Sequence, residues 1–171
     1  VDSHRHEIDI DGLRMHFIDL GAGEPVVMIH GIGDSTYSWR ENAPALVGAG
    51  LRVVLVDQPG FGHSAIPGGR WSYSVERQAE AALRVADPER VDRVAVLSPP
   101  SQRTSCPFGL GTDLIAWAFG TRWFTARALR SAYYRPGRVS DVVIDEYARL
   151  LDRPGRMGRG VVRFVVRVAR Q

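Results

Sequence analysis

The sequence predicts an α/β protein, in which a mostly parallel sheet begins with a β-hairpin and is followed by a helical region. Three observations lead to this fold class. The pair Asp11-Gly12 separates two runs of alternating hydrophobic and polar residues. Two short hydrophobic runs, at 26–29 and 51–57, have the length of buried strands. From residue 113 onward, hydrophobic residues recur at helical spacing instead.

The N-terminal segment is expected to form two antiparallel strands. An Asp-Gly pair between alternating runs is a strong short-range signal for a hairpin. The hydrophobic residues that alternate on its two sides are Ile8, Ile10, Leu13, Met15 and Phe17.

A strand, a helix and a second strand are expected next. Residues 26–29 form an uninterrupted hydrophobic run, as in a strand covered on both faces. Ser38 and Glu41 have the spacing of a capping box, which predicts a helix from Ser38 to 48–50, interrupted at Pro44. The run LRVVLVD then repeats the buried-strand pattern. Such a unit implies a right-handed crossover between parallel strands.

The rest of the chain changes from α/β to helical patterning. Hydrophobic residues at helical spacing predict a helix over 75–86, and VDRVAVL at 91–97 predicts another buried strand. Helical patterns then cover 113–134, 140–151 and the final RGVVRFVVRVARQ.

Composition excludes several classes of function. Cys106 is the only cysteine, so neither an internal disulfide nor a cysteine-based zinc site can form, and we predict no metal and no cofactor. All 22 basic residues are arginine, which indicates a coding bias, so the net charge of +3 does not predict a nucleic-acid partner. No hydrophobic run is long enough to span a membrane. We expect a soluble, cytoplasmic protein, with its oligomeric state left open.

The stretch GFGHSAIPGG at 60–69 could be a nucleotide-binding loop or a nucleophile elbow, and it fits neither. A nucleotide loop needs a helix to begin inside it, whereas Pro67 and two glycines follow. An elbow of the form G-x-S-x-G around Ser64 needs glycine at position 66, where Ile66 stands.

Three segments together resemble landmarks of the α/β-hydrolase fold. They are HGIGDSTYSW at 30–39, RVVLVDQPGFGHS at 52–64 and PERVDRVAVLSPP at 88–100. The resemblance implies an α/β-hydrolase-like core over 1–104 and a helical lid or cap over 105–171. The intact relatives would hydrolyse ester-like or other small organic substrates with a serine nucleophile, an oxyanion hole and a late histidine base.

The resemblance also assigns two loops. The oxyanion loop would be His30, Gly31, Ile32 and Gly33, in which the Ile32 amide donates to the reaction intermediate. The loop after the next strand would have a structural role near the site, and its residues are Asp57, Pro59, Gly60, Gly62 and Ser64. For His30 we favour hydrogen bonds to the loop backbone over proton transfer, because an oxyanion loop works through amides.

The catalytic triad of the family is absent from this chain. One strand-plus-helix unit, which would carry the nucleophile elbow, has no counterpart between 64 and 91. An aspartate nucleophile, as in the dehalogenase and epoxide-hydrolase branches, would occupy the same missing elbow. Ser98 is no substitute, because Pro99 lacks the amide that an oxyanion hole needs. All five histidines precede Ser64, so no late histidine base is present.

The family's lid would place aromatic residues over a substrate pocket, although plain helix packing explains them equally well. The pocket candidates are Trp117, Phe119, Trp123 and Phe124. We therefore expect an incomplete or inactive hydrolase. The alternatives are a non-catalytic binder of a small hydrophobic or ester-like molecule, and an enzyme with an unrecognised site around His30, Asp57 and His63.

Overall fold

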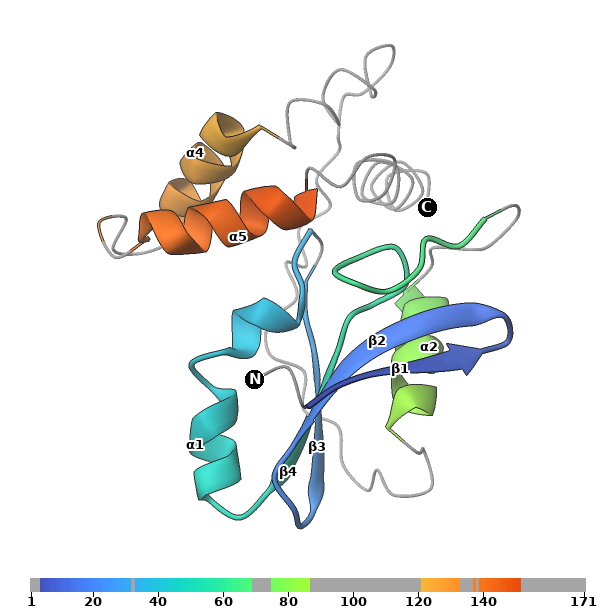
Figure 1. Ribbon diagram of the computed structural model, residues 1–171. Coiled ribbons are helices and arrows are strands. Elements are labelled where there is room, and N and C mark those ends of the chain that lie inside the picture. Colours follow the sequence, from blue (N-terminus) through green and yellow to red (C-terminus); the bar gives the residue numbers. More distant parts are fainter. Residues whose placement is uncertain are drawn as a thin grey trace. The chain divides into compact units, whose positions relative to one another are not determined.

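The computed structural model describes residues 4–31, 33–68, 75–86, 121–132, 137 and 139–151. The chain divides into two compact units, residues 1–104 and 105–171, whose described elements are drawn in colour in Figure 1. The first unit contains a sheet with flanking helices, and the second contains helices. The lid role of the second unit stays a prediction.

The predicted hairpin is confirmed, with β1 at Arg5–Ile10 and β2 at Leu13–Leu20. These strands pair antiparallel with Ile10 opposite Leu13. Asp11 and Gly12 have φ angles of 55° and 78°, the positive values that a tight two-residue hairpin turn requires. The Asp9 carboxylate accepts a hydrogen bond from the Gly12 amide at 2.8 Å, which fixes the turn.

The α/β fold class and the parallel strand pair are also confirmed. Strands β3, Pro25–Ile29, and β4, Arg52–Val56, pair in parallel, as the strand-helix-strand pattern predicted. The described sheet has the order β1-β2-β4-β3 and is mixed, because the hairpin joins β4 through an antiparallel pairing of β2 (Figure 1).

Helices α1, Ala43–Gly48, and α2, Val75–Val85, lie on opposite sides of the sheet (Figure 1). Successive β4 side chains alternate between the two resulting cores. Val53 and Leu55 share one core with Ala43 of α1. The other core is larger and combines sheet and α2 residues: Ile10, Met15, Val54, Val56, Ala81, Ala82 and Ala86. Burying each valine contributes about 1.5–3 kcal/mol, and β4 contributes valines to both cores.

Strand β3 is less covered than its hydrophobic run predicted. Val26, Val27 and Met28 are half-buried, and Ile29 is 37% exposed. Within the described sheet β3 lies at the edge and pairs with β4 alone. Among the described residues, β3 therefore does not show the covering on both faces that its hydrophobic run predicted, and the strand predicted at 91–97 lies outside these residues.

The helix expected to begin at Ser38 begins later. A 3-10 helix covers Thr36–Trp39, and the Ser35 side chain caps it by accepting from the Tyr37 amide at 3.2 Å. Helix α1 starts at Ala43 and carries its proline in the first turn. Proline has no amide hydrogen and fits the first turn of a helix better than its interior, so Pro44 selects this start over the Ser38–Glu41 capping box.

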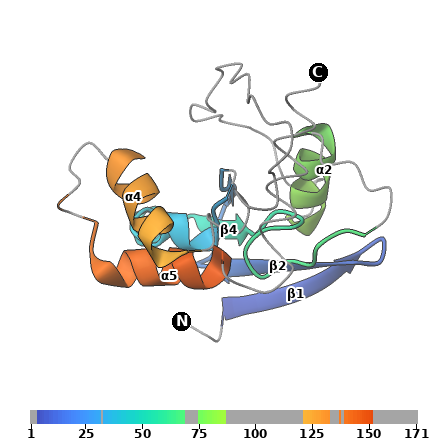
Figure 2. The same cartoon turned by 90° about the horizontal axis from the view of Figure 1, so that it is seen from above.

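The second unit contains the predicted helices in the form of α4, Arg122–Ala132, and α5, Asp141–Leu151. They pack on one another, as Figures 1 and 2 both show. Ile144 of α5 is fully buried, whereas Val142 on the same helix is 72% exposed. Arg122 ties the pair together through ion pairs to Asp141 at 3.0 Å and Asp145 at 2.5 Å.

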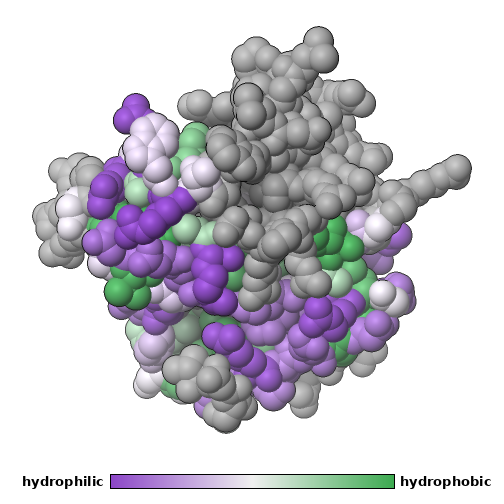
Figure 3. All heavy atoms as spheres, turned by 45° about the horizontal axis from the view of Figure 1, so that its top comes forward, coloured by the Kyte–Doolittle hydropathy of each residue, from purple (hydrophilic) through white to green (hydrophobic). Residues whose placement is uncertain are grey.

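Several predicted elements lie outside the described residues: the strand at 91–97, the helical pattern before 121 and the final helical segment. In the described segments, no helix has the length and hydrophobicity needed to cross a membrane. The face shown in Figure 3 is mainly hydrophilic where it is coloured, with hydrophobic residues in separate small groups.

Candidate active site

The loop after β3 is organised around the buried side chain of His30. His30 Nε2 accepts from the Gln58 amide at 3.1 Å, so its Nδ1 carries the hydrogen and donates to the Gly31 carbonyl at 2.7 Å. The Gln58 side-chain amide in turn donates to the His30 carbonyl. Both ring nitrogens are thus engaged with loop backbone, which is the role that sequence analysis favoured over proton transfer.

The rest of the candidate oxyanion loop forms a tight turn. The Asp34 amide donates to the Gly31 carbonyl at 3.3 Å, and Gly33 has a φ of 77°. A positive φ of this size favours glycine, which explains Gly33 locally. Ile32, the expected amide donor, lies outside the described residues, so its role stays a prediction.

Asp57 is the centre of the loop after β4 and is fully buried. Its Oδ1 accepts from the Thr36 amide at 2.7 Å. Its Oδ2 accepts from the His63 amide at 2.9 Å and from His16 Nδ1 at 2.8 Å. The carboxylate therefore connects β2, the loop after β3 and the loop after β4.

These contacts set the charge of Asp57. Burial raises the pKa of the carboxyl group, but the hydrogen bond from His16, the contact with His63 and the nearby His30 ring lower it by more. The net result is a pKa well below the usual range. Asp57 is an anion at neutral pH and cannot act as a proton donor there.

Ser64 and two glycines complete the loop. The Ser64 hydroxyl donates to the Asp57 carbonyl at 2.6 Å and accepts from the His16 amide at 2.8 Å. Gly60 and Gly62 have φ angles of 85° and 50°. A Cβ atom on Gly62 would lie 2.2 Å from the Asp57 carboxyl carbon. The stretch GFGHS therefore closes the loop over Asp57. Its serine hydroxyl stabilises the loop through these two hydrogen bonds.

Two of the four aromatic pocket candidates lie among the described residues. Trp123 is 71% exposed and its neighbour Phe124 is half-buried, both on α4. Trp117 and Phe119 lie outside the described residues. The pocket that these residues were expected to line stays a prediction.

Comparison with known families identifies the fold in which these loops lie. Residues 24–97 match the family of proteins with the alpha/beta hydrolase fold, and this range includes both loops around His30 and Asp57. The N-terminal unit belongs to the α/β-hydrolase fold family. The first two landmark segments of the sequence analysis lie inside the match, and the third overlaps its end.

Individual relatives agree with this family. Bifunctional epoxide hydrolase 2 of Sus scrofa is 42% identical over 74 residues, which are 43% of this chain and 13% of that protein. Haloalkane dehalogenase of Psychrobacter cryohalolentis is 38% identical over 77 residues, 44% of this chain and 25% of that protein. The chain thus spans a quarter or less of these two relatives. It has the α/β-hydrolase fold, and its sequence is related to those of epoxide hydrolases and haloalkane dehalogenases.

Solved structures give the same fold. The crystal structure of Cfl2 from Burkholderia cenocepacia aligns over 97% of this chain and 71% of its own, with a TM-score of 0.74 and 26% sequence identity.

Within the α/β-hydrolase fold, sequence reasoning missed a side chain of the site. His16 lies on β2, 41 positions before Asp57, and only the pairing of β2 with β4 brings the two together. The alternation along β2 shows which face His16 occupies, but no local signal reveals its partner. Among the described residues, no hydrogen bond joins a serine hydroxyl to a histidine ring.

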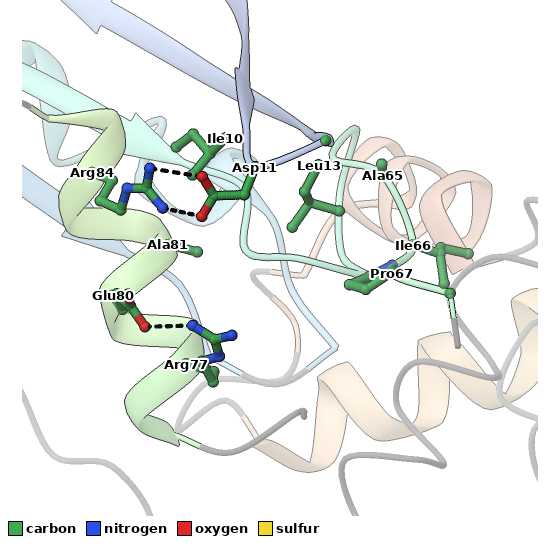
Figure 4. A pocket seen from close by; sticks show the side chains of 12 residues that line it. Ile10, Asp11, Leu13, Ala65, Ile66, Pro67, Arg77, Glu80, Ala81 and Arg84 are labelled. Carbon is green, nitrogen blue, oxygen red and sulfur yellow. Dashed lines mark hydrogen bonds and ion pairs between the residues drawn. The ribbon is translucent and has the colours of Figure 1, made fainter. Parts of the chain in front are cut away.

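A cavity of about 350 Å³ lies beside the end of the loop after β4. Its walls are the β1–β2 turn, residues 65–68 and one face of α2, as Figure 4 shows. Arg84 pairs with Asp11 across its edge, and Arg77 pairs with Glu80 along α2 at 3.0 Å. Neither His30 nor Asp57 lines it.

Proposed function

We propose that this chain is an α/β-hydrolase relative that does not catalyse hydrolysis through a triad of its own. One observation carries the proposal. Residues 69–90, between the loop after β4 and the predicted strand at 91–97, contain α2 with its 11 residues. A further strand and helix would need on the order of 25 to 30 residues. The segment leaves no room for the strand-plus-elbow unit that presents a nucleophile.

The remaining candidates for a nucleophile or base support the proposal. The Ser64 hydroxyl donates one hydrogen bond and accepts another, and the Ser35 side chain caps the 3-10 helix. His30 has both ring nitrogens bonded to backbone. None of these groups is available to attack a substrate or to move a proton.

The names of the relatives indicate which substrates to test. We select an epoxide and a haloalkane as test substrates, because two relatives are an epoxide hydrolase and a haloalkane dehalogenase. If an aspartate of this chain attacked such a substrate, it would form an ester. Because no histidine follows Ser64 in the sequence and none of the described groups is placed to activate water against that ester, the adduct would persist. It would add the whole mass of an epoxide, but only the alkyl group of a haloalkane, because the halide leaves.

The test is intact-mass spectrometry of the folded chain after incubation with styrene oxide, 1-bromohexane or a fluorophosphonate. Product formation from the first two compounds and from p-nitrophenyl acetate is measured in parallel. We expect neither an adduct nor product above the buffer rate. A stoichiometric adduct would overturn the proposal, and peptide mapping would then name the nucleophile. Turnover that is lost in His63→Ala would point instead to the site around His30, Asp57 and His63.

The cavity beside α2 favours a second function, the binding of a small hydrophobic molecule without turnover. Its volume of about 350 Å³ lies at the lower end of the range for ligand pockets. Its hydrophobic walls include Ile10, Leu13 and Ile66, and arginines lie along its α2 side. This composition fits a compact hydrophobic ligand that carries one polar group.

Binding of a hydrophobic fluorescent probe, 1-anilinonaphthalene-8-sulfonate, tests this second function. We expect saturable binding to the parent chain and weaker binding to Ala65→Leu, in which a larger side chain enters the cavity. Gly137→Ala, at a residue of the other unit, serves as the control and should bind like the parent. Unsaturable binding, or equal binding by Ala65→Leu, would exclude the cavity as the site.

A further inference from the structure

Three side chains that can ligate a metal ion converge beside the loop after β4. His16 comes from β2, Asp57 follows β4 directly, and His63 lies in the loop itself. One ligand atom from each lies within 4.8 Å of the other two. His16 Nδ1 is 2.8 Å and His63 Nδ1 is 3.5 Å from the same oxygen, Asp57 Oδ2.

Hydrogen bonding within the fold does not account for the His63 ring. Its Nδ1 atom is buried, and among the described residues it has no hydrogen-bond partner. Asp57 Oδ2 lies 3.5 Å from this nitrogen, which is longer than the 2.7–3.2 Å of an ordinary N–H···O hydrogen bond. A buried ring nitrogen without a partner is costly, and it calls for a group that the protein itself does not supply.

The donor set and its spacing suit a first-row transition ion. Imidazole nitrogen and carboxylate oxygen bind Zn²⁺ at about 2.0–2.2 Å, so two ligands of a tetrahedral ion lie roughly 3.3 Å apart. The distances of 2.8 Å and 3.5 Å from Asp57 Oδ2 lie on either side of this value. The His63 side chain, 21% exposed, is the least confined of the three and can rotate to close the remaining gap.

We propose that His16, Asp57 and His63 form a binding site for one Zn²⁺ ion, with His16 Nδ1, an Asp57 carboxylate oxygen and His63 Nδ1 as ligands. His16 changes tautomer on binding, so that its hydrogen moves from Nδ1 to Nε2 and the Nδ1 lone pair faces the ion. His63 binds as the neutral ring with its hydrogen on Nε2. A water molecule takes the fourth position, on the exposed side of His63.

The backbone already holds the carboxylate in place for this role. The Thr36 amide donates to Asp57 Oδ1 and the His63 amide to Oδ2, and both hydrogen bonds can persist when the ion is bound. Such outer contacts orient a ligating carboxylate. The ion would join β2 to the loop after β4 in addition to the hydrogen bonds of Ser64, and so would stabilise the N-terminal unit.

The test is isothermal titration of ZnCl₂ into the full chain, prepared without an affinity tag and freed of metal by dialysis against a chelator. We expect one ion per chain and a rise in Tm on saturation, since a ligand that binds only the folded state stabilises it. His63→Ala should lower the affinity at least tenfold. His6→Ala is the matched control, because His6 is exposed on β1 and stacks on Phe17 away from the cluster.

A second measurement needs no variant. Imidazole ¹⁵N chemical shifts of the parent chain, recorded with and without Zn²⁺, identify the ligating nitrogens, and we expect Nδ1 of His16 and Nδ1 of His63. The proposal is overturned if Zn²⁺ does not saturate a site below about 100 µM, where binding is weaker than the affinities of structural zinc sites. It is also overturned if His63→Ala binds as tightly as the parent, or if the shifted nitrogens belong to His4 or His6.

Discussion

Gly62 lies so close to the Asp57 carboxyl group that the loop after β4 accepts only a hydrogen atom in place of a side chain. In Gly62→Ala the new methyl group would overlap the carboxylate, at a residue whose φ of 50° already disfavours alanine. We expect a loss of about 3 kcal/mol or more in the free energy of unfolding, measured by urea denaturation, from overpacking and backbone strain together.

The matched control is Gly12→Ala in the β1–β2 turn. Gly12 also has a positive φ, but no atom lies within 4 Å of the position where a Cβ would stand. In this variant the free energy of unfolding should fall by about 1–2 kcal/mol, from backbone strain alone. Equal losses in the two variants would mean that the loop can move away from Asp57, against the packing described above.

Asp19 and Arg52 form a two-pronged ion pair between β2 and β4, with Arg52 Nε 2.9 Å from one carboxylate oxygen and an Arg52 terminal nitrogen 2.6 Å from the other. The hydrogen bond from Arg52 is the main cause that lowers the pKa of Asp19. Asp19→Asn should therefore cost about 0.5–1 kcal/mol at neutral pH.

The pH dependence of this pair follows from the sign of the shift. Because the folded state lowers the pKa of Asp19, the stabilisation is complete above the unfolded value of about 3.9 and is lost as pH falls through the lower folded value. Urea denaturation from pH 7 to pH 2 should show the parent and Asp19→Asn converging only below about pH 4. Convergence of the two curves well above pH 4 would contradict the pairing of Asp19 with Arg52.

At the level of single residues, the sequence identified the loop around Asp57 but not its partners. Asp57, Gly62 and Ser64 are adjacent in the chain and follow a recognisable strand, so their grouping can be predicted. His16 and the Thr36 amide reach Asp57 through the pairing of β2 with β4 and the path of the loop after β3. Those contacts depend on strand register and loop geometry, which no short stretch of sequence specifies.

Among the elements, α5 offers the clearest test of packing in the second unit. Ile144 is fully buried there, and Val142 points to solvent on the same helix. We expect Ile144→Ala to destabilise the unit by about 2–4 kcal/mol, because it leaves a cavity. Val142→Ala should change the stability by less than about 0.5 kcal/mol. Thermal melts followed by circular dichroism, with limited proteolysis between α4 and α5, distinguish the two.

The helix boundaries show which sequence features predict where a helix begins. Helix α5 begins where Ser140 can cap it, and its hydroxyl accepts from the Val143 amide at 3.4 Å, so pattern and cap agree. At Ser38 the cap signal and the proline at position 44 conflict. The proline decides the outcome there, because its missing amide hydrogen and fixed φ restrict the backbone more than one side-chain hydrogen bond can compensate.

Across the N-terminal unit as a whole, protection against hydrogen exchange should follow the sheet. Strand β4 pairs on both sides and its valines are fully buried, whereas β1 and β3 lie at the edges of the described sheet. We expect the amides of Val54 and Val56 to exchange slowest, and those of β1 to exchange at least tenfold faster. Slower exchange in β1 than in β4 would contradict the strand order.

For the molecule as a whole, hydrophobic patterning predicted the α/β class, the hairpin and the parallel pair. Each of these follows from local periodicity or from a turn of two residues. The place of β3 within the described sheet could not be predicted in the same way, because an identical hydrophobic run serves an edge or a central strand depending on which other strands are present. The topology of the sheet decides how far the side chains of that run are buried.

The closure of GFGHS over Asp57 has a consequence for how such genes change over time. Every residue of this closure supports the folded chain: the glycine by its lack of a side chain, the serine by its two hydrogen bonds, the aspartate by its three donors. Mutations in it would be removed by selection for folding even in a lineage that had lost turnover. This stretch can therefore outlive the chemistry, and by itself it is a poor marker of an active enzyme.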